Sequence, residues 1–297
     1  MAKLVGNWWM SNFLNGTDAN DDITGMGFID ILHGGGGADT IHGGGGDDQI
    51  FGDAGDDKLF GDEGDDKLRG GEDDDTLDGG KGDDLLYGDG DQDTFIDVRG
   101  NNTFDGGSGF DTADYSGFTG GRVKVTLADA GSVGFTLRDD FIAQGNGGHY
   151  ELNSYDYLYS IERVVGTSGD DEIIGNNSAN VLRGGAGADK LTGGGGADNF
   201  QFQEGDLTQS NEIITDYDEF DRIDLHAIDA QTNFNGNNEF HIVTGGFTGA
   251  SGELWVFRNF SGDVHLSGDT NGDGVSDFHL RIHEATPGAL NFSDILL

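Results

Sequence analysis

The chain has 297 residues, with 56 Asp and Glu against 15 Lys and Arg, so its formal net charge is −41. It contains 56 glycines, one proline and no cysteine, which excludes disulfides, thiolate metal sites, a cysteine nucleophile and collagen. The few basic residues argue against nucleic-acid binding, and no apolar run is long enough for a transmembrane helix. A chain this acidic either stays unfolded or binds cations.

Residues 1–15 are predicted to form an N-terminal cap. They include Trp8, Trp9, Met10 and Phe13, apolar side chains that would cover the exposed first coil of a repeat structure. The apolar run is short, is interrupted by polar residues and lacks a small-residue cleavage site. A secretory signal peptide is therefore not expected here.

A nine-residue repeat fills residues 16–114 without a break, in eleven units. Each unit begins with glycines, which permit the positive φ angles of a tight turn, and its last three residues are predicted to form a very short strand. The eighth place is apolar and is predicted to point inward. The sixth place is acidic in all but one unit, at Asp21, Asp30, Asp39, Asp48, Asp57, Asp66, Asp75, Asp84, Asp93 and Asp111.

Two such units are expected to close one coil, so aspartates 18 residues apart should stack at the same edge. Asp39 and Asp57 would belong to one column, and Asp30 and Asp48 to the other. Stacked carboxylates repel each other unless a divalent cation lies between them, and oxygen ligands in flexible loops favour Ca²⁺ over Mg²⁺. The alternative is an acidic linker that never folds, but a linker is not expected to keep its frame through eleven units.

Residues 115–165 leave the nine-residue frame and are predicted to be a β-rich insertion. Residues 123–127 and 155–159 alternate between apolar and polar side chains, as strands do. The tyrosines of this region could stack on a sugar, which would imply a polysaccharide or cell-surface partner. Ordinary sheet packing is the simpler interpretation. Outward residues of the first array, among them Phe51 and Tyr87, are predicted to be covered by this insertion or by another molecule.

A second array of four units fills residues 166–201. Its sixth places predict metal ligands at Asp171, Asp189 and Asp198. Units 97–105 and 175–183 carry Asn102 and Asn180 in the sixth place, and calcium is not assigned to them.

These repeats carry a family resemblance. Residues 34–42 read GGGGADTIH and match GGxGxDxUx at every fixed place, so the sequence resembles the RTX, or haemolysin-type, calcium-binding repeats. Residues 159–167 (YSIERVVGT) are similar to the segment that often precedes such an array. The resemblance implies an all-β fold, a parallel β-roll in two arrays with a C-terminal β-rich cap, and about ten Ca²⁺ ions between the turns.

Residues 202–297 are predicted to be that cap and to carry an export signal. Residues 213–229 and 268–278 resemble the C-terminal domain of the serralysin metalloproteases. The second stretch also fits part of an EF-hand loop, and the alternative is a turn rich in Asx residues. Its oxygen ligands would be Asp269, Asn271, Asp273 and Asp277.

The chain ends in DILL at residues 294–297. The resemblance implies that this end belongs to an uncleaved signal read by a type I secretion apparatus. The alternative is a frayed last strand. Secretion of an unfolded chain agrees with the calcium argument, because cytosolic calcium is too low to fold the roll. We therefore expect an extracellular protein that is unfolded at low calcium and folded at millimolar calcium.

No catalytic centre is predicted. The HExxH zinc motif of serralysins is missing, and no GxSxG elbow occurs. His279 and His283 lie in a strand-like stretch, where their spacing would not bring both rings to one metal. The sequence predicts a secreted, non-enzymatic calcium-binding protein. The alternative is the C-terminal export and folding module of a larger secreted hydrolase, such as a serralysin-like metalloprotease.

Overall fold

The computed structural model describes residues 3–96, 99–118, 121–127, 129, 134–140, 154–207, 212–231 and 238–297, with the backbone alone for 134–140, 154 and 155. Parts of the predicted cap, of the unit 97–105, of the insertion 115–165 and of the C-terminal region lie outside these ranges. Within these ranges the fold is all-β, as predicted, apart from one 3-10 turn, η1 (Phe292–Asp294). No helix in these ranges is long and apolar enough to cross a membrane.

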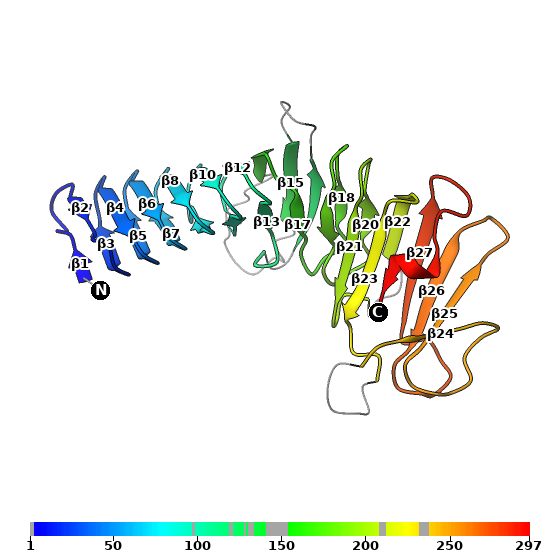
Figure 1. Ribbon diagram of the computed structural model, residues 1–297. Helices are drawn as coiled ribbons and strands as arrows, with labels where there is room; N and C mark the ends of the chain where they lie inside the picture. Colours follow the sequence, from blue (N-terminus) through cyan, green and yellow to red (C-terminus); the bar gives the residue numbers. More distant parts are fainter. Residues whose placement is uncertain are drawn as a thin grey trace, which may run out of the picture. The chain divides into compact units, whose positions relative to one another are not determined.

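The chain forms two compact units, one of residues 1–118 and 127–164 and the other of residues 119–126 and 165–297. In the first unit, successive strands of residues 3–114 alternate between two sheets, in which they pair in parallel (Figure 1). One sheet has the order β1 (Lys3–Val5), β3 (Asp22–Met26), β5 (Thr40–Gly45), β7 (Lys58–Glu63), β9 (Thr76–Asp78), β11 (Thr94–Phe95) and β13 (Thr112–Asp114). The other has the order β2 (Phe13–Asn15), β4 (Ile31–Gly36), β6 (Gln49–Ala54), β8 (Lys67–Glu72), β10 (Leu85–Gly90), β12 (Thr103–Ser108), β16 (Ser154–Tyr159) and β15 (Gly134–Asp140).

The register of these sheets follows the sequence repeat. Leu32 of β4 pairs with Ile50 of β6, and Ile41 of β5 pairs with Leu59 of β7, each 18 residues further along the chain. The predicted inward residues form the core, because every eighth-place side chain of the first array is fully buried. These residues are Ile23, Leu32, Ile41, Ile50, Leu59, Leu68, Leu77, Leu86, Phe95, Phe104 and Ala113.

The expectation of three-residue strands is wrong for most of the first array, where seven strands have six residues. Parallel pairing continues past the ninth place into the next turn, so that Gly35 pairs with Asp53 and Gly36 with Ala54. In most units of the first array the second place has positive φ, for example 102° at Gly35 and 121° at Met26. Glycine adopts this conformation freely, whereas methionine is strained by it.

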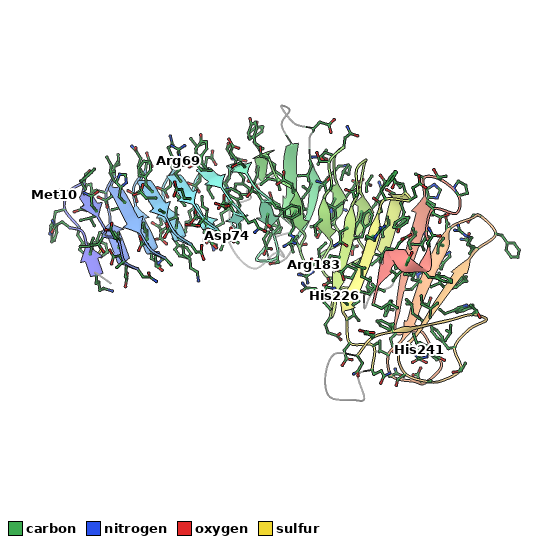
Figure 2. The ribbon with its side chains drawn as sticks, viewed as in Figure 1. Met10, Arg69, Asp74, Arg183, His226 and His241 are labelled. Atoms are coloured by element: carbon green, nitrogen blue, oxygen red, sulfur yellow. The ribbon has the colours of Figure 1, made fainter. Side chains whose placement is uncertain are left out.

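The outer faces of this roll carry stacked side chains. The ring of His33 stacks on Phe51 at 4.5 Å, and its Nδ1 lies 3.1 Å from Oδ2 of Asp53. Two described strands of the insertion, β16 and β15, extend the edge of the second sheet, where β15 is antiparallel to β16. That the insertion or another molecule covers the outward side chains of the first array stays a prediction. In the turn between β1 and β2, Met10 and the neighbouring Trp9 are 59% and 83% exposed (Figure 2). This turn therefore leaves its apolar side chains in contact with solvent.

The second unit also contains two sheets. One has the order β19 (Val181–Arg183), β21 (Asn199–Gln203), β23 (Arg222–Ala227) and β28 (Ile295–Leu296). The other has the order β14 (Gly121–Thr126), β18 (Glu172–Ile174), β20 (Lys190–Thr192), β22 (Glu212–Tyr217), β27 (Phe278–Glu284), β26 (Val264–Asp269), β25 (Glu253–Arg258) and β24 (His241–Val243). The short strand β17 (Arg163–Val165) falls at the boundary between the units in sequence.

The C-terminal part of the second unit is a mixed sheet. β27 continues the roll by pairing in parallel with β22, and β26 is antiparallel to both of its neighbours, β27 and β25. The last strand, β28, pairs in parallel with β23, so the chain end is part of a sheet and is not frayed.

Candidate metal centre

The sixth-place aspartates form the two predicted columns. The backbone N–H of Asp39 donates to Oδ1 of Asp57 at 2.7 Å, and the N–H of Asp48 donates to Oδ1 of Asp66 at 2.6 Å. The same bond recurs along both arrays, and each of these carboxylates is at most 4% exposed. One oxygen of each carboxylate therefore replaces a backbone acceptor between neighbouring coils.

The second oxygen has no such role. At nine of the predicted ligands, Oδ2 is buried and accepts no hydrogen bond from the described residues. These nine are Asp30, Asp39, Asp48, Asp57, Asp66, Asp75, Asp93, Asp111 and Asp189. A buried carboxylate oxygen without a donor is costly, so each of these positions requires a proton or a cation.

The surroundings of these oxygens supply further acceptors. A Cβ placed on Gly34 would lie 2.3 Å from Oδ2 of Asp39 and 2.6 Å from the carbonyl oxygen of Gly52. The opening glycine is therefore required by close approach, and two acceptors face each other beside it. Carboxylate and carbonyl oxygens are the ligands of a hard cation, and this mixture suits Ca²⁺.

The side chains do not form a cage on their own. Within the described ranges, no three His, Asp or Glu side chains come together in a way that could hold a metal ion. An ion in these columns would therefore be held by carboxylates of successive coils together with backbone carbonyls of the turns. This donor set fits calcium, which accepts six to eight oxygen ligands in irregular geometry.

The pKa values show the cost of the unloaded columns. The pKa values of Asp48, Asp57, Asp66 and Asp93 are raised to about 7, mainly by burial and also by neighbouring carboxylates, although the bond from the backbone N–H lowers them. Burial likewise raises the pKa of Asp75 to about 8. Without a cation, a folded column therefore retains protons near neutral pH.

Two of the predicted ligands already have donors for the second oxygen. Oδ2 of Asp21 accepts bonds from the N–H and the hydroxyl of Thr17, both at 2.8 Å. Oδ2 of Asp171 accepts the N–H of Thr167 at 2.6 Å and its hydroxyl at 3.1 Å. Each array thus opens on a carboxylate that the protein itself satisfies, and a calcium role for these two stays a prediction.

Asparagine satisfies the sixth place differently. Asn102 keeps the ladder bond by accepting the N–H of Asp84 at 3.0 Å, while its Nδ2 donates to the carbonyl of Arg99 at 2.6 Å. The amide thus places a donor where aspartate has an unpaired oxygen. This agrees with leaving Asn102 out of the predicted ligands.

Sequence analysis missed four carboxylates that continue the columns. Asn102 donates its N–H to Asp156 and Asp111 donates its N–H to Glu162. In the second unit, Asp189 donates its N–H to Glu212, and Asp198 donates its N–H to Asp221. Each of the four is followed two residues later by a buried apolar side chain, Leu158, Val164, Ile214 or Ile223. That pairing was the available signal, but spacings of 51, 54 and 23 residues hid it.

The predicted EF-hand-like ligands lie in a tight loop that bonds to itself. Oδ1 of Asp269 accepts the N–H of Gly272 at 2.6 Å, and Oδ2 of Asp277 accepts the N–H of Thr270 at 2.7 Å. Oδ1 of Asn271 accepts the N–H of Asp273, and Oδ1 of Asp273 accepts the N–H of Val275, both at 2.8 Å. These are the bonds of Asx turns. A calcium ion at this loop stays a prediction.

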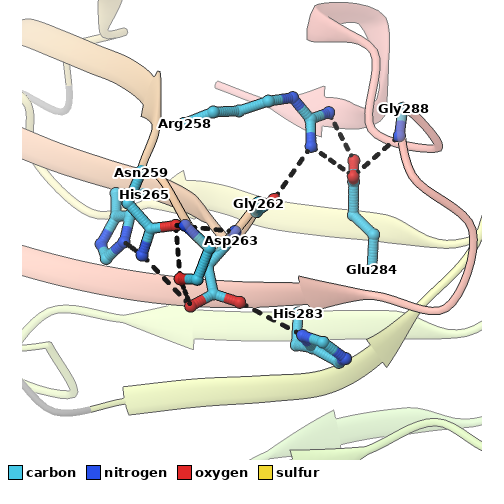
Figure 3. A network of polar contacts seen from close by, with 9 residues as sticks. Arg258, Asn259, Gly262, Asp263, His265, His283, Glu284 and Gly288 are labelled. Atoms are coloured by element: carbon cyan, nitrogen blue, oxygen red, sulfur yellow. Dashed lines mark hydrogen bonds and ion pairs between the residues drawn. The ribbon is translucent and has the colours of Figure 1, made fainter.

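The histidines of β27 point to separate partners. Nδ1 of His283 lies 3.2 Å from Asp263, which is held by Asn259 and Ser261 (Figure 3). Nε2 of His279 lies 2.7 Å from Nδ1 of His265. The two residues that sequence analysis compared with a zinc motif thus contact different groups on neighbouring strands.

Comparison with known proteins identifies the repeats. The RTX calcium-binding nonapeptide repeat (four copies) family matches residues 15–50, 24–59, 60–95, 99–113 and 165–200. These stretches contain the sixth-place aspartates but not the four carboxylates that continue the columns, and residues 201–297 are not matched. No curated protein is significantly similar to the chain.

Proposed function

This chain carries RTX calcium-binding nonapeptide repeats in both arrays, and from that premise we propose that it is a secreted protein that folds on Ca²⁺ after type I export. The observation that carries the proposal is the row of buried carboxylate oxygens that have no donor in the described structure. Calcium would be held there by the sixth-place aspartates and turn carbonyls, and it would supply the positive charge that the columns lack.

Calcium concentration then decides where the chain folds. Ligation stabilises only the folded state, by RT ln(1 + [Ca²⁺]/Kd) for each site. Loops of the extracellular kind bind with Kd of about 10⁻⁴ to 10⁻³ M, so cytosolic calcium leaves the sites empty and external calcium fills them. Export of an unfolded chain agrees with this, as does an export signal at residues 294–297.

A calcium titration tests the folding step. Far-UV circular dichroism in EGTA should show an unfolded chain at neutral pH, and millimolar calcium should restore the β-sheet spectrum. Isothermal calorimetry on the same protein counts the ions, which we expect to be about ten per chain. A full β-sheet spectrum in EGTA at pH 8, unchanged by calcium, would refute the proposal.

Export is tested separately. Deletion of residues 294–297 should retain the chain inside a host that carries a type I apparatus, while the wild-type chain reaches the medium. The calcium titration of the shortened chain serves as its control, because β28 contributes only two residues to one sheet edge. Secretion of the shortened chain at wild-type yield would refute the export signal.

A second candidate is the export and folding module of a larger secreted hydrolase. It is favoured by the resemblance of residues 213–229 and 268–278 to the C-terminal domain of serralysins. The module would have no catalytic centre of its own, so the calcium-loaded chain is expected not to hydrolyse casein. Casein hydrolysis by the purified chain would overturn the non-enzymatic proposal.

A further inference from the structure

The column that contains Asp171 and Asp189 does not end with the repeats. Glu212 occupies a sixth place in a coil that lacks the glycine pattern, 23 residues after Asp189, and its Oε2 accepts the N–H of Asp189 at 3.1 Å. Ile214 stands two residues later and is fully buried, as in a repeat. The strand that begins at Glu212, β22, pairs in parallel with β20 and thus continues the roll beyond the stretch that the RTX family matches.

Two buried oxygens at this point have no donor. Glu212 and Asp189 are each 1% exposed, and neither Oε1 of Glu212 nor Oδ2 of Asp189 accepts a hydrogen bond from the described residues. The guanidinium of Arg183, which is labelled in Figure 2, forms two bonds to Asp206, at 2.8 and 3.0 Å. Asp206 is itself buried and adds to the negative potential.

Two of the other three carboxylates that continue the columns, Asp156 and Asp221, provide a contrast. Oδ2 of Asp156 accepts the hydroxyl of Tyr115 at 3.1 Å, and Oδ2 of Asp221 accepts the N–H of Asp218 at 2.8 Å. At these two positions a protein donor satisfies the oxygen on which a repeat would bind an ion. Glu212 lacks such a donor in the described structure, although it is as deeply buried.

We propose that Asp189 and Glu212 bind one further divalent cation of the calcium class, at a junction site that the repeat pattern does not contain. The inference rests on the proposed function for the identity of the ion. The site lies where the roll meets the mixed sheet, because Glu212 pairs with Leu280 at the start of the β22–β27 contact. An ion here ties the C-terminal sheet to calcium binding even though that sheet has no repeats.

The junction site is tested by counting the bound ions in a variant that replaces the Glu212 carboxylate by an uncharged amide. Glu212→Gln keeps an oxygen that accepts the Asp189 N–H and puts a neutral amide donor in place of the unpaired Oε1, so the fold should persist without the ion. Calorimetry should then count one calcium ion fewer per chain than in the wild type. The matched control is Asp156→Asn, whose amide donates to the hydroxyl of Tyr115, and its count should not change.

Two further measurements keep the test decisive. Glu212→Asp restores the carboxylate of a repeat and should recover the wild-type count, which a merely structural role for Glu212 would not predict. In a background with Trp8→Phe and Trp9→Phe, Trp255 of β25 is the sole tryptophan. Its emission at saturating calcium should be the same in all variants, which shows that the mixed sheet is folded.

The outcomes separate this inference from the proposed function. A Glu212→Gln chain that is folded by Trp255 emission and binds as many ions as the wild type overturns the junction site alone. Loss of the ion from Glu212→Asp as well as Glu212→Gln also overturns it. A wild-type chain that binds no calcium refutes the proposed function first, and the junction site with it.

Discussion

Protons should replace calcium in the columns. If burial without a donor is what makes the carboxylates costly, then acid should fold the metal-free chain by neutralising the same oxygens. The perturbation is a change of pH from about 8 to about 5.5 in the presence of EGTA. We expect the β-sheet spectrum to be absent at the higher pH and to appear reversibly at the lower pH.

The sign and size follow from the pKa values. Asp57 has a pKa of about 7 in the folded chain against 3.8 in an unfolded one, so the folded chain holds this proton more tightly. Its contribution to stability is fully present below about pH 4 and is lost as the pH rises through about 7. At pH 8 the cost of ionising this one group reaches at most about 4 kcal/mol. Domains are stable by only about 5–15 kcal/mol, so a few such groups prevent folding without calcium.

The assay is far-UV circular dichroism in EGTA, with gel filtration to show that the acid state is compact and unaggregated. At pH 8, added calcium should produce the same spectrum. Asparagine in place of Asp48, Asp66 and Asp93 should reduce the steepness of the pH transition, because three titrating groups are then absent. No gain of structure on acidification, in a chain that calcium does fold, would show that burial of these carboxylates is not the barrier.

Four substitutions test other parts of the structure in the calcium-loaded protein. Met26→Gly should raise the melting temperature, because it relieves a positive φ that costs methionine about 1 kcal/mol. Leu59→Ala should lower the free energy of unfolding by about 2–5 kcal/mol, since Leu59 is fully buried in the roll. Thr167→Val should cost about 1–3 kcal/mol, because it removes the hydroxyl that bonds to Asp171. Asn102→Asp should add one calcium ion by calorimetry, because it removes the donor to the Arg99 carbonyl. An unchanged or lower melting temperature would contradict the prediction for Met26→Gly, and a loss below about 1 kcal/mol would contradict the one for Leu59→Ala. An unchanged free energy of unfolding would contradict the prediction for Thr167→Val, and an unchanged ion count would contradict the one for Asn102→Asp.

Controls for these substitutions come from the same chain. Thr24→Gly alters a strand position of ordinary φ two residues before Met26 and should destabilise the chain. Leu85→Ala truncates a seventh-place side chain, next to the buried Leu86, that is 41% exposed, so it should cost far less than Leu59→Ala.

The regular part of the fold could be predicted because each place of the repeat has one physical requirement. An inward side chain must be apolar, as Leu32 and Ile50 are, and a turn residue at positive φ is best as glycine, as Gly35 is. Eleven units in one frame then fix both the register and the columns. The strand lengths were not predicted because backbone pairing continues through the turn glycines, which carry no side-chain pattern.

The non-repeating part of the columns escaped prediction for a different reason. A carboxylate such as Glu212 is recognised only by its place relative to Asp189, and an insertion of five residues removes that reference. Thr17 and Thr167 look like imperfect repeats in sequence. The structure shows that they are donors to the first carboxylate of each array. A residue that breaks the repeat motif can still donate a hydrogen bond to a column carboxylate. Such bonds are seen only in the folded structure, because a linear motif does not contain them.

The number of bound ions should therefore depend on how many column carboxylates lack a hydrogen-bond donor, and not on how many aspartates the repeats contain. The columns contain carboxylates that bond to threonine, tyrosine or backbone N–H groups as well as carboxylates that bond to nothing on one side. Only the second kind gains from an ion, because a satisfied oxygen would lose one partner in acquiring another. An ion count that follows the unsatisfied oxygens would exclude Asp21 and Asp171 and include Glu212, whereas the motif alone would do the opposite. Calorimetry on Asp171→Asn and Glu212→Gln distinguishes the two rules, because the rule of unsatisfied oxygens predicts that only Glu212→Gln lowers the ion count, whereas the motif alone predicts that only Asp171→Asn lowers it.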